Sequence, residues 1–126
     1  MTLSVLANID VDDLAHAAEF YCAALELEVG RRFGDQAIEL VGASSKIYLL
    51  KHAAGTLATP SSSQRRDFTR HWTPVHLDFH VADFDAAVER VRAAGGAIEN
   101  EFRHHGPKPV AFCGDPFGNG FCVIGD

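Results

Sequence analysis

Positive charge is scarce in this sequence of 126 residues. It has 11 lysine and arginine side chains against 17 aspartate and glutamate side chains, so the formal net charge is −6. An acidic balance of this size repels the phosphate backbone of nucleic acids, and we expect no nucleic-acid partner. The chain length and a hydrophobic content of 47% predict one globular domain with a core of its own.

Cysteine is also scarce, and the number and spacing of the cysteines argue against structural disulfides. Cys22, Cys113 and Cys122 are an odd number of residues and include no Cys-x-x-Cys pair. This pattern argues against a secreted disulfide framework and for a reducing compartment. The first 13 residues hold no basic segment and reach three carboxylates before any apolar stretch could serve as a signal or membrane anchor. We therefore expect a cytoplasmic protein with no membrane partner.

The first part of the chain, about residues 1–54, predicts a βαβββ module. The segment SVLANIDV predicts a strand, and Asp12 or Asp13 begins a helix over Leu14–Leu25 whose apolar residues recur at helical spacing. Three short runs follow, EVGRRFG, QAIELVG and KIYLLKH, separated by Gly, Ser and Asp. They predict a three-stranded meander.

The last part, about residues 75–126, repeats this order of elements. The segment PVHLDFHV predicts a strand, and Asp83 or Asp85 caps the helix FDAAVERVRAA. The runs AIENEF, KPVAFCG and GFCVIG predict three more strands, with a tight hairpin at DPFGN. Displacing the chain by 70 residues places Asp13 on Asp83. The predicted fold class is α+β, with two βαβββ modules forming a curved mixed sheet around a cavity.

Between the modules, about residues 55–74 form a connector rich in serine, threonine and proline. One interpretation is a solvated linker. The other is that Arg65, Arg66 and Arg70, with Trp72, overhang the cavity mouth and attract an anionic group of a ligand.

The strand predicted at PVHLDFHV carries ionisable side chains on one face. Alternation places Val75, Leu77, Phe79 and Val81 toward the helix. It places His76, Asp78 and His80 on the opposite face. This face is either the hydrated side of the sheet, or it lines a cleft in which Asp78 orients His76 for proton transfer or ligand binding. The adjacent His104 and His105 are instead expected in a surface turn.

These features together resemble the vicinal oxygen chelate superfamily, which includes glyoxalase I, bleomycin-resistance proteins, fosfomycin-resistance enzymes and extradiol dioxygenases. The resemblance is carried by the two βαβββ modules, the segment VHLDFHVADFDAAVERVRAAG and the terminal hairpin FCGDPFGNGFCVIG. It implies a sheet-lined cavity, histidine or glutamate metal ligands at four inward positions in the chelating members, and a homodimer.

The four ligand positions implied by this resemblance are only partly filled. The first falls on Leu6, and the second falls on Tyr48 or Leu50, none of which is a usual metal ligand. His76 fills the third, and Cys122 stands where the family usually has glutamate. Cys122 is either a small buried apolar residue or an unusual thiolate ligand. The chain therefore resembles metal-free bleomycin-resistance-like members most closely. No cofactor is expected, and a divalent metal at His76 and Cys122 is the alternative.

The leading hypothesis is a protein that binds a mainly apolar or aromatic small molecule carrying a polar or anionic group. The expected ligand contacts are Leu6, Asn8, Tyr48, Leu50, Trp72, His76, Asp78, Phe112 and Cys122. The alternative is an enzyme, either a glyoxalase-like lyase or isomerase or a relative of the dioxygenases. In that case His76 and Asp78 are the catalytic residues, with or without a divalent metal.

Overall fold

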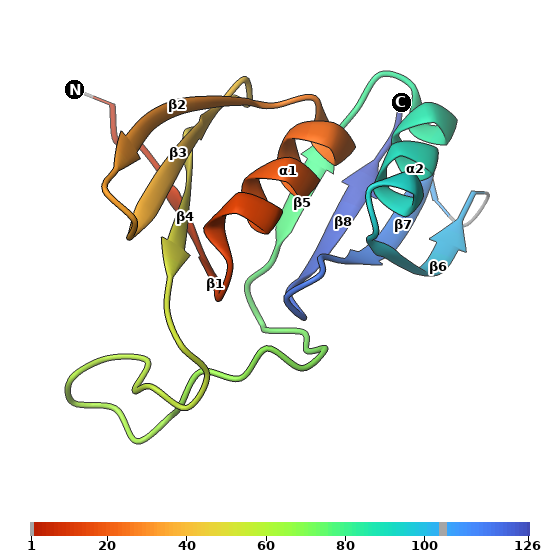
Figure 1. Ribbon diagram of the computed structural model, residues 1–126. Coiled ribbons are helices and arrows are strands. Elements are labelled where there is room, and N and C mark those ends of the chain that lie inside the picture. Colours follow the sequence, from red (N-terminus) through yellow and green to blue (C-terminus); the bar gives the residue numbers. More distant parts are fainter. Residues whose placement is uncertain (1, 104–105) are drawn as a thin grey trace.

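The computed structural model describes residues 2–103 and 106–126, and the turn expected at His104 and His105 lies outside them. Two modules with the same element order follow each other along the chain (Figure 1). The first comprises β1 (Ala7–Val11), α1 (Leu14–Leu25), β2 (Glu28–Phe33), β3 (Ala37–Val41) and β4 (Ile47–Lys51). The second comprises β5 (Leu77–His80), α2 (Phe84–Ala93), β6 (Ala97–Phe102), β7 (Val110–Gly114) and β8 (Gly120–Ile124). The predicted fold class is confirmed.

Both helices begin directly after an aspartate that caps them. The Asp13 carboxylate accepts a hydrogen bond from the His16 amide at 3.0 Å, and Asp83 accepts one from Ala86 at 3.1 Å. Each bond satisfies an N–H group that the first helical turn leaves without an intrahelical partner. The cap of the second helix is therefore Asp83 and not Asp85.

Each module has a four-stranded mixed sheet of its own. Sheet one has the order β1-β4-β3-β2, and sheet two has the order β5-β8-β7-β6. Strands β1 and β5 each pair in parallel with the last strand of their module, and the remaining pairs are antiparallel. Figure 1 shows the two sheets side by side, with α1 and α2 as neighbours. We call the side of each sheet away from its helix the open face.

The helix-facing sides of both sheets share one buried apolar cluster. Its fully buried members include Val11, Phe20, Leu40, Leu49, Val91 and Val123. Helix α1 joins the two halves of the cluster, because the Phe20 and Tyr21 rings lie 6.3 and 6.2 Å from the ring of Phe121 in sheet two. Apolar burial is the main stabilising term, so this shared cluster holds the modules together.

A buried hydrogen bond also crosses between the modules. The Tyr21 hydroxyl on α1 donates to the Asp115 carboxylate in the β7–β8 turn at 2.6 Å. The same carboxylate accepts hydrogen bonds from the backbone amides of Phe117 and Asn119, at 2.8 and 2.9 Å. Burial raises the pKa of Tyr21, and the nearby Asp115 charge raises it further. The phenol therefore remains a donor over the whole neutral range.

Strand β5 is shorter than the sequence predicts. Its ladder with β8 starts at the pair Leu77–Phe121, because β8 itself begins only at Gly120. Val75, which alternation placed toward the helix, precedes the strand and is 84% exposed. The prediction was wrong at this position and correct for Phe79, which packs against the core.

No helix in the described part of the chain, residues 2–103 and 106–126, is long and apolar enough to span a membrane.

We expect Tyr21→Phe to lower the free energy of unfolding by about 1–3 kcal/mol, because the buried Asp115 carboxylate loses a donor and keeps its desolvation cost. Urea denaturation monitored by circular dichroism measures this change. Tyr48→Phe is a matched control, because Tyr48 is only half-buried whereas Tyr21 is 1% exposed. Equal stability of Tyr21→Phe and the wild type would contradict the assignment.

Candidate functional site

The open face of sheet two brings together three of the predicted site residues. Asp78 on β5 lies opposite Cys122 on β8, and Cys122 lies opposite Phe112 on β7. Residues directly opposite each other across strands project from the same face. Asp78 is exposed, Phe112 is half-buried and Cys122 is 2% exposed.

His76 reaches the same face from just before β5. Its Nε2 atom lies 3.2 Å from Oδ1 of Asp78. One donor atom each from His76, Asp78 and Cys122 lies within 4.8 Å of the other two. A carboxylate at this distance from an imidazole fixes the ring orientation and favours the tautomer that donates to it. The structure thus places both predicted catalytic residues, His76 and Asp78, in direct contact.

Both cysteines of sheet two are protonated thiols at neutral pH. Burial raises the pKa of Cys122 to about 11, and the charge of Asp78 and a hydrogen bond with it contribute. Burial likewise raises the pKa of Cys113 to about 12. Thiolates, not thiols, are nucleophiles. The geometry therefore favours a packing role for Cys122 over a nucleophilic one when no metal is bound.

The connector fixes Trp72 on the open face of sheet two. Arg70 binds the Glu99 carboxylate through two nitrogen atoms, each at 2.7 Å, and the Trp72 indole donates to the same carboxylate at 3.0 Å. The indole ring then lies edge-to-face with the rings of His76 and Phe112, at centroid distances of 5.5 and 5.6 Å. The predicted ligand residue Trp72 therefore lies beside His76.

Two glycines permit this docking, and Glu99 anchors it. A Cβ atom at Gly120 would lie 2.6 Å from the Trp72 indole, and one at Gly114 would lie 2.6 Å from Arg70. Sequence reasoning missed Glu99, because no local pattern links it to a connector residue 29 positions away.

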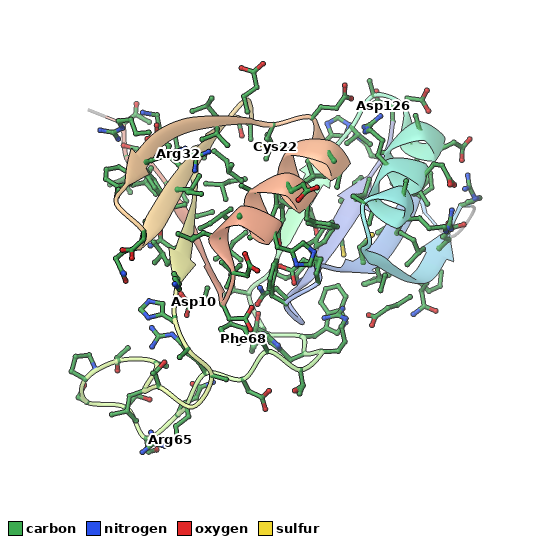
Figure 2. All side chains as sticks on the ribbon, viewed as in Figure 1. Asp10, Cys22, Arg32, Arg65, Phe68 and Asp126 are labelled. Atoms are coloured by element: carbon green, nitrogen blue, oxygen red, sulfur yellow. The ribbon has the colours of Figure 1, made fainter. Side chains whose placement is uncertain are left out.

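The connector arginines are held by the protein itself. Arg66 donates to the Asp10 carboxylate at 2.8 Å and to the carbonyl of Ala58 at 3.2 Å. Arg70 is bound to Glu99, and Arg65 donates to the Gly55 carbonyl. Figure 2 shows Arg65 on the outlying part of the connector. The expectation that these arginines attract a ligand anion therefore gains no support.

A cleft of about 460 Å³ opens between β1 and β5, at the edges where the two sheets meet. Three predicted ligand residues line it, namely Asn8, Leu50 and His76. Its apolar walls are Ile9, Leu50, Val75, Leu77, Phe79 and Phe121. The predicted residues Leu6 and Tyr48 line a different recess. The predicted ligand contacts therefore do not lie in one pocket. They are distributed over the cleft, this recess and the open face of sheet two.

The open face of sheet one carries a buried carboxylate. Glu39 on β3 is 3% exposed and lies opposite Tyr48. The Arg31 guanidinium binds it at 2.8 Å, the Tyr48 hydroxyl donates to it at 3.0 Å, and the Lys46 amine lies 3.5 Å away. Hydrogen bonds from Arg31 and Tyr48 lower the pKa of Glu39 to about 2. Tyr48, predicted as a ligand contact, is therefore engaged with Glu39.

Comparison with known sequences identifies the family of this chain. A family model described as a glyoxalase-like domain matches residues 7–124. A curated isoleucine–tRNA ligase from Cronobacter sakazakii is 31% identical over 96 residues, which are 72% of this chain and 10% of that protein. The chain thus spans about a tenth of the length of the curated relative it matches.

Solved structures share the fold over nearly the whole chain. A hypothetical protein from S. aureus has a TM-score of 0.76 at 23% identity, covering 100% of this chain and 95% of its own. A lactoylglutathione lyase from Agrobacterium tumefaciens has a TM-score of 0.68 at 18% identity, and the match covers 99% of this chain and 94% of that one. A third structure is a mutant of the fosfomycin resistance protein FosX from Listeria monocytogenes, complexed with Mn(II) and 1S,2S-dihydroxypropylphosphonic acid. It has a TM-score of 0.73 at 18% identity, and the match covers 98% of this chain and 88% of that one.

The low pKa of Glu39 makes stability depend on pH. Its carboxylate has an ordinary pKa of 4.5 and a folded pKa of about 2, so its contribution is complete above 4.5 and is lost as pH falls toward 2. We expect Glu39→Gln to flatten this part of the stability curve, measured by urea denaturation at a series of pH values. Tyr48→Phe removes one hydrogen bond to Glu39, so the acid slope of its stability curve should lie between those of the wild type and Glu39→Gln. An unchanged acid slope in Glu39→Gln would disprove the assignment.

Proposed function

This chain belongs to the glyoxalase-like domain family, and from that premise we propose that it binds a small organic molecule beside His76. The molecule would occupy the cleft between β1 and β5. We further propose that residues 1–126 act as one domain in a reducing, cytoplasmic setting, in line with three free cysteines.

The observation that carries this proposal is the make-up of the cleft. Its size is that of a small-molecule site, and its lining combines apolar side chains with polar groups that can set the orientation of the ligand. The Asn8 side chain makes no hydrogen bond to the described residues, so its amide is free for a ligand. Asp10 and Arg66 also line the cleft, but they neutralise each other at 2.8 Å. Asn8 and His76 therefore remain as the polar contacts, and a neutral or weakly polar aromatic compound fits best.

We expect His76→Ala and Asn8→Ala to weaken ligand binding by about tenfold or more, or about 1.4 kcal/mol, because each removes a polar contact. A library of aromatic acids, aromatic amines and neutral analogues is screened by calorimetry against the purified protein. Fluorescence of Trp72, the single tryptophan, is a second readout because its ring meets His76.

The matched control for this experiment is His80→Ala. His80 projects from the same strand but lines a different recess and pairs with Asp126. The His80→Ala variant should bind the ligand with the same affinity as the wild type. Unchanged affinity in both cleft variants, or an equal loss in His80→Ala, would refute the assigned site.

An enzyme is the second candidate, and the contact between His76 and Asp78 favours it. An imidazole held by a carboxylate at 3.2 Å is suited to general-base catalysis in a lyase or isomerase. Turnover of a bound compound that Asp78→Asn slows without weakening binding would establish this candidate. Binding without turnover would reject the enzyme and support the binding protein.

We also propose a homodimer, because both open faces carry exposed apolar side chains. Phe33 and Leu6, in the first module, are 43% and 56% exposed. Trp72 and Phe102, at sheet two, are 40% and 39% exposed. Large exposed apolar side chains that gather on one face of a protein often mark an interaction surface. A second copy could also reunite the predicted walls Tyr48 and Phe112, which this chain keeps apart.

Light scattering at micromolar concentration should give twice the 13.7 kDa mass of one chain. Phe33→Asp should shift the protein toward monomer, because it places a charge on the open face of sheet one. Leu57→Asp changes a connector residue that is 38% exposed, and it should leave the mass unchanged. A wild-type mass near 13.7 kDa would reject the dimer.

A further inference from the structure

A recess at the start of β1 combines a surplus positive charge with exposed apolar side chains. We propose that this recess binds a carboxylate with an apolar chain, such as a medium-chain fatty carboxylate. The site goes beyond the proposed function, because none of the described residues lines both this recess and the cleft between β1 and β5.

The recess lies between the N-terminal segment and the turn that joins β3 to β4. Its volume is about 600 Å³, which is within the range of small-molecule sites. In Figure 1 the N-terminal segment lies on the side of sheet one away from the second module. The apolar lining comes from this segment and the polar lining from the turn, with Leu3, Val5 and Leu6 in the first group and Ser44, Ser45 and Lys46 in the second.

The polar end of the recess has more positive than negative charge. Arg31 and Lys46 both contact Oε2 of the buried Glu39 carboxylate, at 2.8 and 3.5 Å. The Arg31 backbone amide donates to Oε1 at 3.1 Å, and the Tyr48 hydroxyl donates to Oε2 at 3.0 Å. In these contacts two cations meet one carboxylate, which is satisfied without Lys46. The Lys46 amine, on a side chain that is 52% exposed, therefore keeps donors and charge for a ligand.

Two serine hydroxyls line the recess next to this amine. The side chains of Ser44 and Ser45 make no hydrogen bond to the described residues, so both can donate to a ligand. A carboxylate accepts such bonds, and the Lys46 ammonium adds a charge-assisted one. A ligand amine would meet the Lys46 charge and be repelled. The polar end thus favours a carboxylate over an alcohol or an amine.

The apolar end consists of side chains that the rest of the chain leaves in water. Leu3, Val5 and Leu6 are 92%, 71% and 56% exposed. An apolar chain bound along them would remove its own surface and theirs from water, and this burial is favourable. A carboxylate without such a chain would lose this part of the binding energy.

The test is a calorimetric titration of the full-length protein with hexanoate at low ionic strength, where exposed charges are screened least. Hexanol lacks the charge, hexylamine reverses it, and acetate lacks the chain. We expect hexanoate to saturate at one molecule per chain and hexanol to bind about threefold to tenfold more weakly, because one charge-assisted contact is lost. Hexylamine and acetate should bind more weakly than hexanol.

A lysine pair on one strand supplies the matched variants. Lys46→Gln should weaken hexanoate binding by about threefold to tenfold and leave hexanol binding unchanged. This variant should fold, because Arg31 and Tyr48 still satisfy Glu39, and circular dichroism checks this. Lys51→Gln changes an exposed lysine at the other end of β4 that lines a different recess. Its affinity for hexanoate should equal that of the wild type.

His76→Ala separates this site from the cleft. Hexanoate affinity should be unchanged in this variant, because His76 lines the cleft and not the recess. Absence of saturable hexanoate binding by the folded wild type, equal affinity for hexanol, or an equal loss in Lys51→Gln would overturn the proposal. Loss of binding in His76→Ala with normal binding in Lys46→Gln would also overturn it, and would place the carboxylate in the cleft.

Discussion

The hydrogen bond between Tyr21 and Asp115 gives a fixed register to the two modules that the shared apolar cluster holds together. It joins residues 94 positions apart, and both partners are buried, so neither can exchange the bond for water without cost. Asn119 extends the connection, because its side-chain amide donates both to Asp115, at 2.9 Å, and to the backbone of Asp10 on β1, at 3.2 Å. The β7–β8 turn of sheet two is thereby fixed to α1 and β1 of the first module. Asn119 of that turn and Gly120 and Phe121 after it line the cleft between β1 and β5.

Sequence periodicity predicted the local elements well, because local forces determine them. The aspartates 70 positions apart cap equivalent helices, and the meander strands of both modules lie where alternation and turn residues placed them. The beginning of β5 could not be predicted in this way. Strand length depends on the partner strand, and Val75 has none because β8 starts at Gly120.

The candidate site divides in the same manner. Alternation alone was sufficient to place His76 and Asp78 on one face, and the register of β5 with β8 then adds Cys122. The docking of Trp72 through Arg70 and Glu99 depends on contacts between distant segments, and no spacing in the sequence encodes it. The same limit applies to Glu39, which lies on β3, next to the strand β4 that carries Tyr48 and Leu50. Only the register shows that it meets Tyr48.

His76 connects the cleft to the open face of sheet two through one imidazole ring. It lines the cleft between β1 and β5, and its Nε2 atom lies 3.2 Å from Asp78 on the open face of sheet two. A carboxylate at this distance restricts the orientation of the ring, so a change at Asp78 also changes the polar contact that the cleft presents. The Trp72 ring lies 5.5 Å from the same imidazole and its indole nitrogen donates to Glu99. The connector therefore restricts the His76 ring as well, although Trp72 does not itself line the cleft.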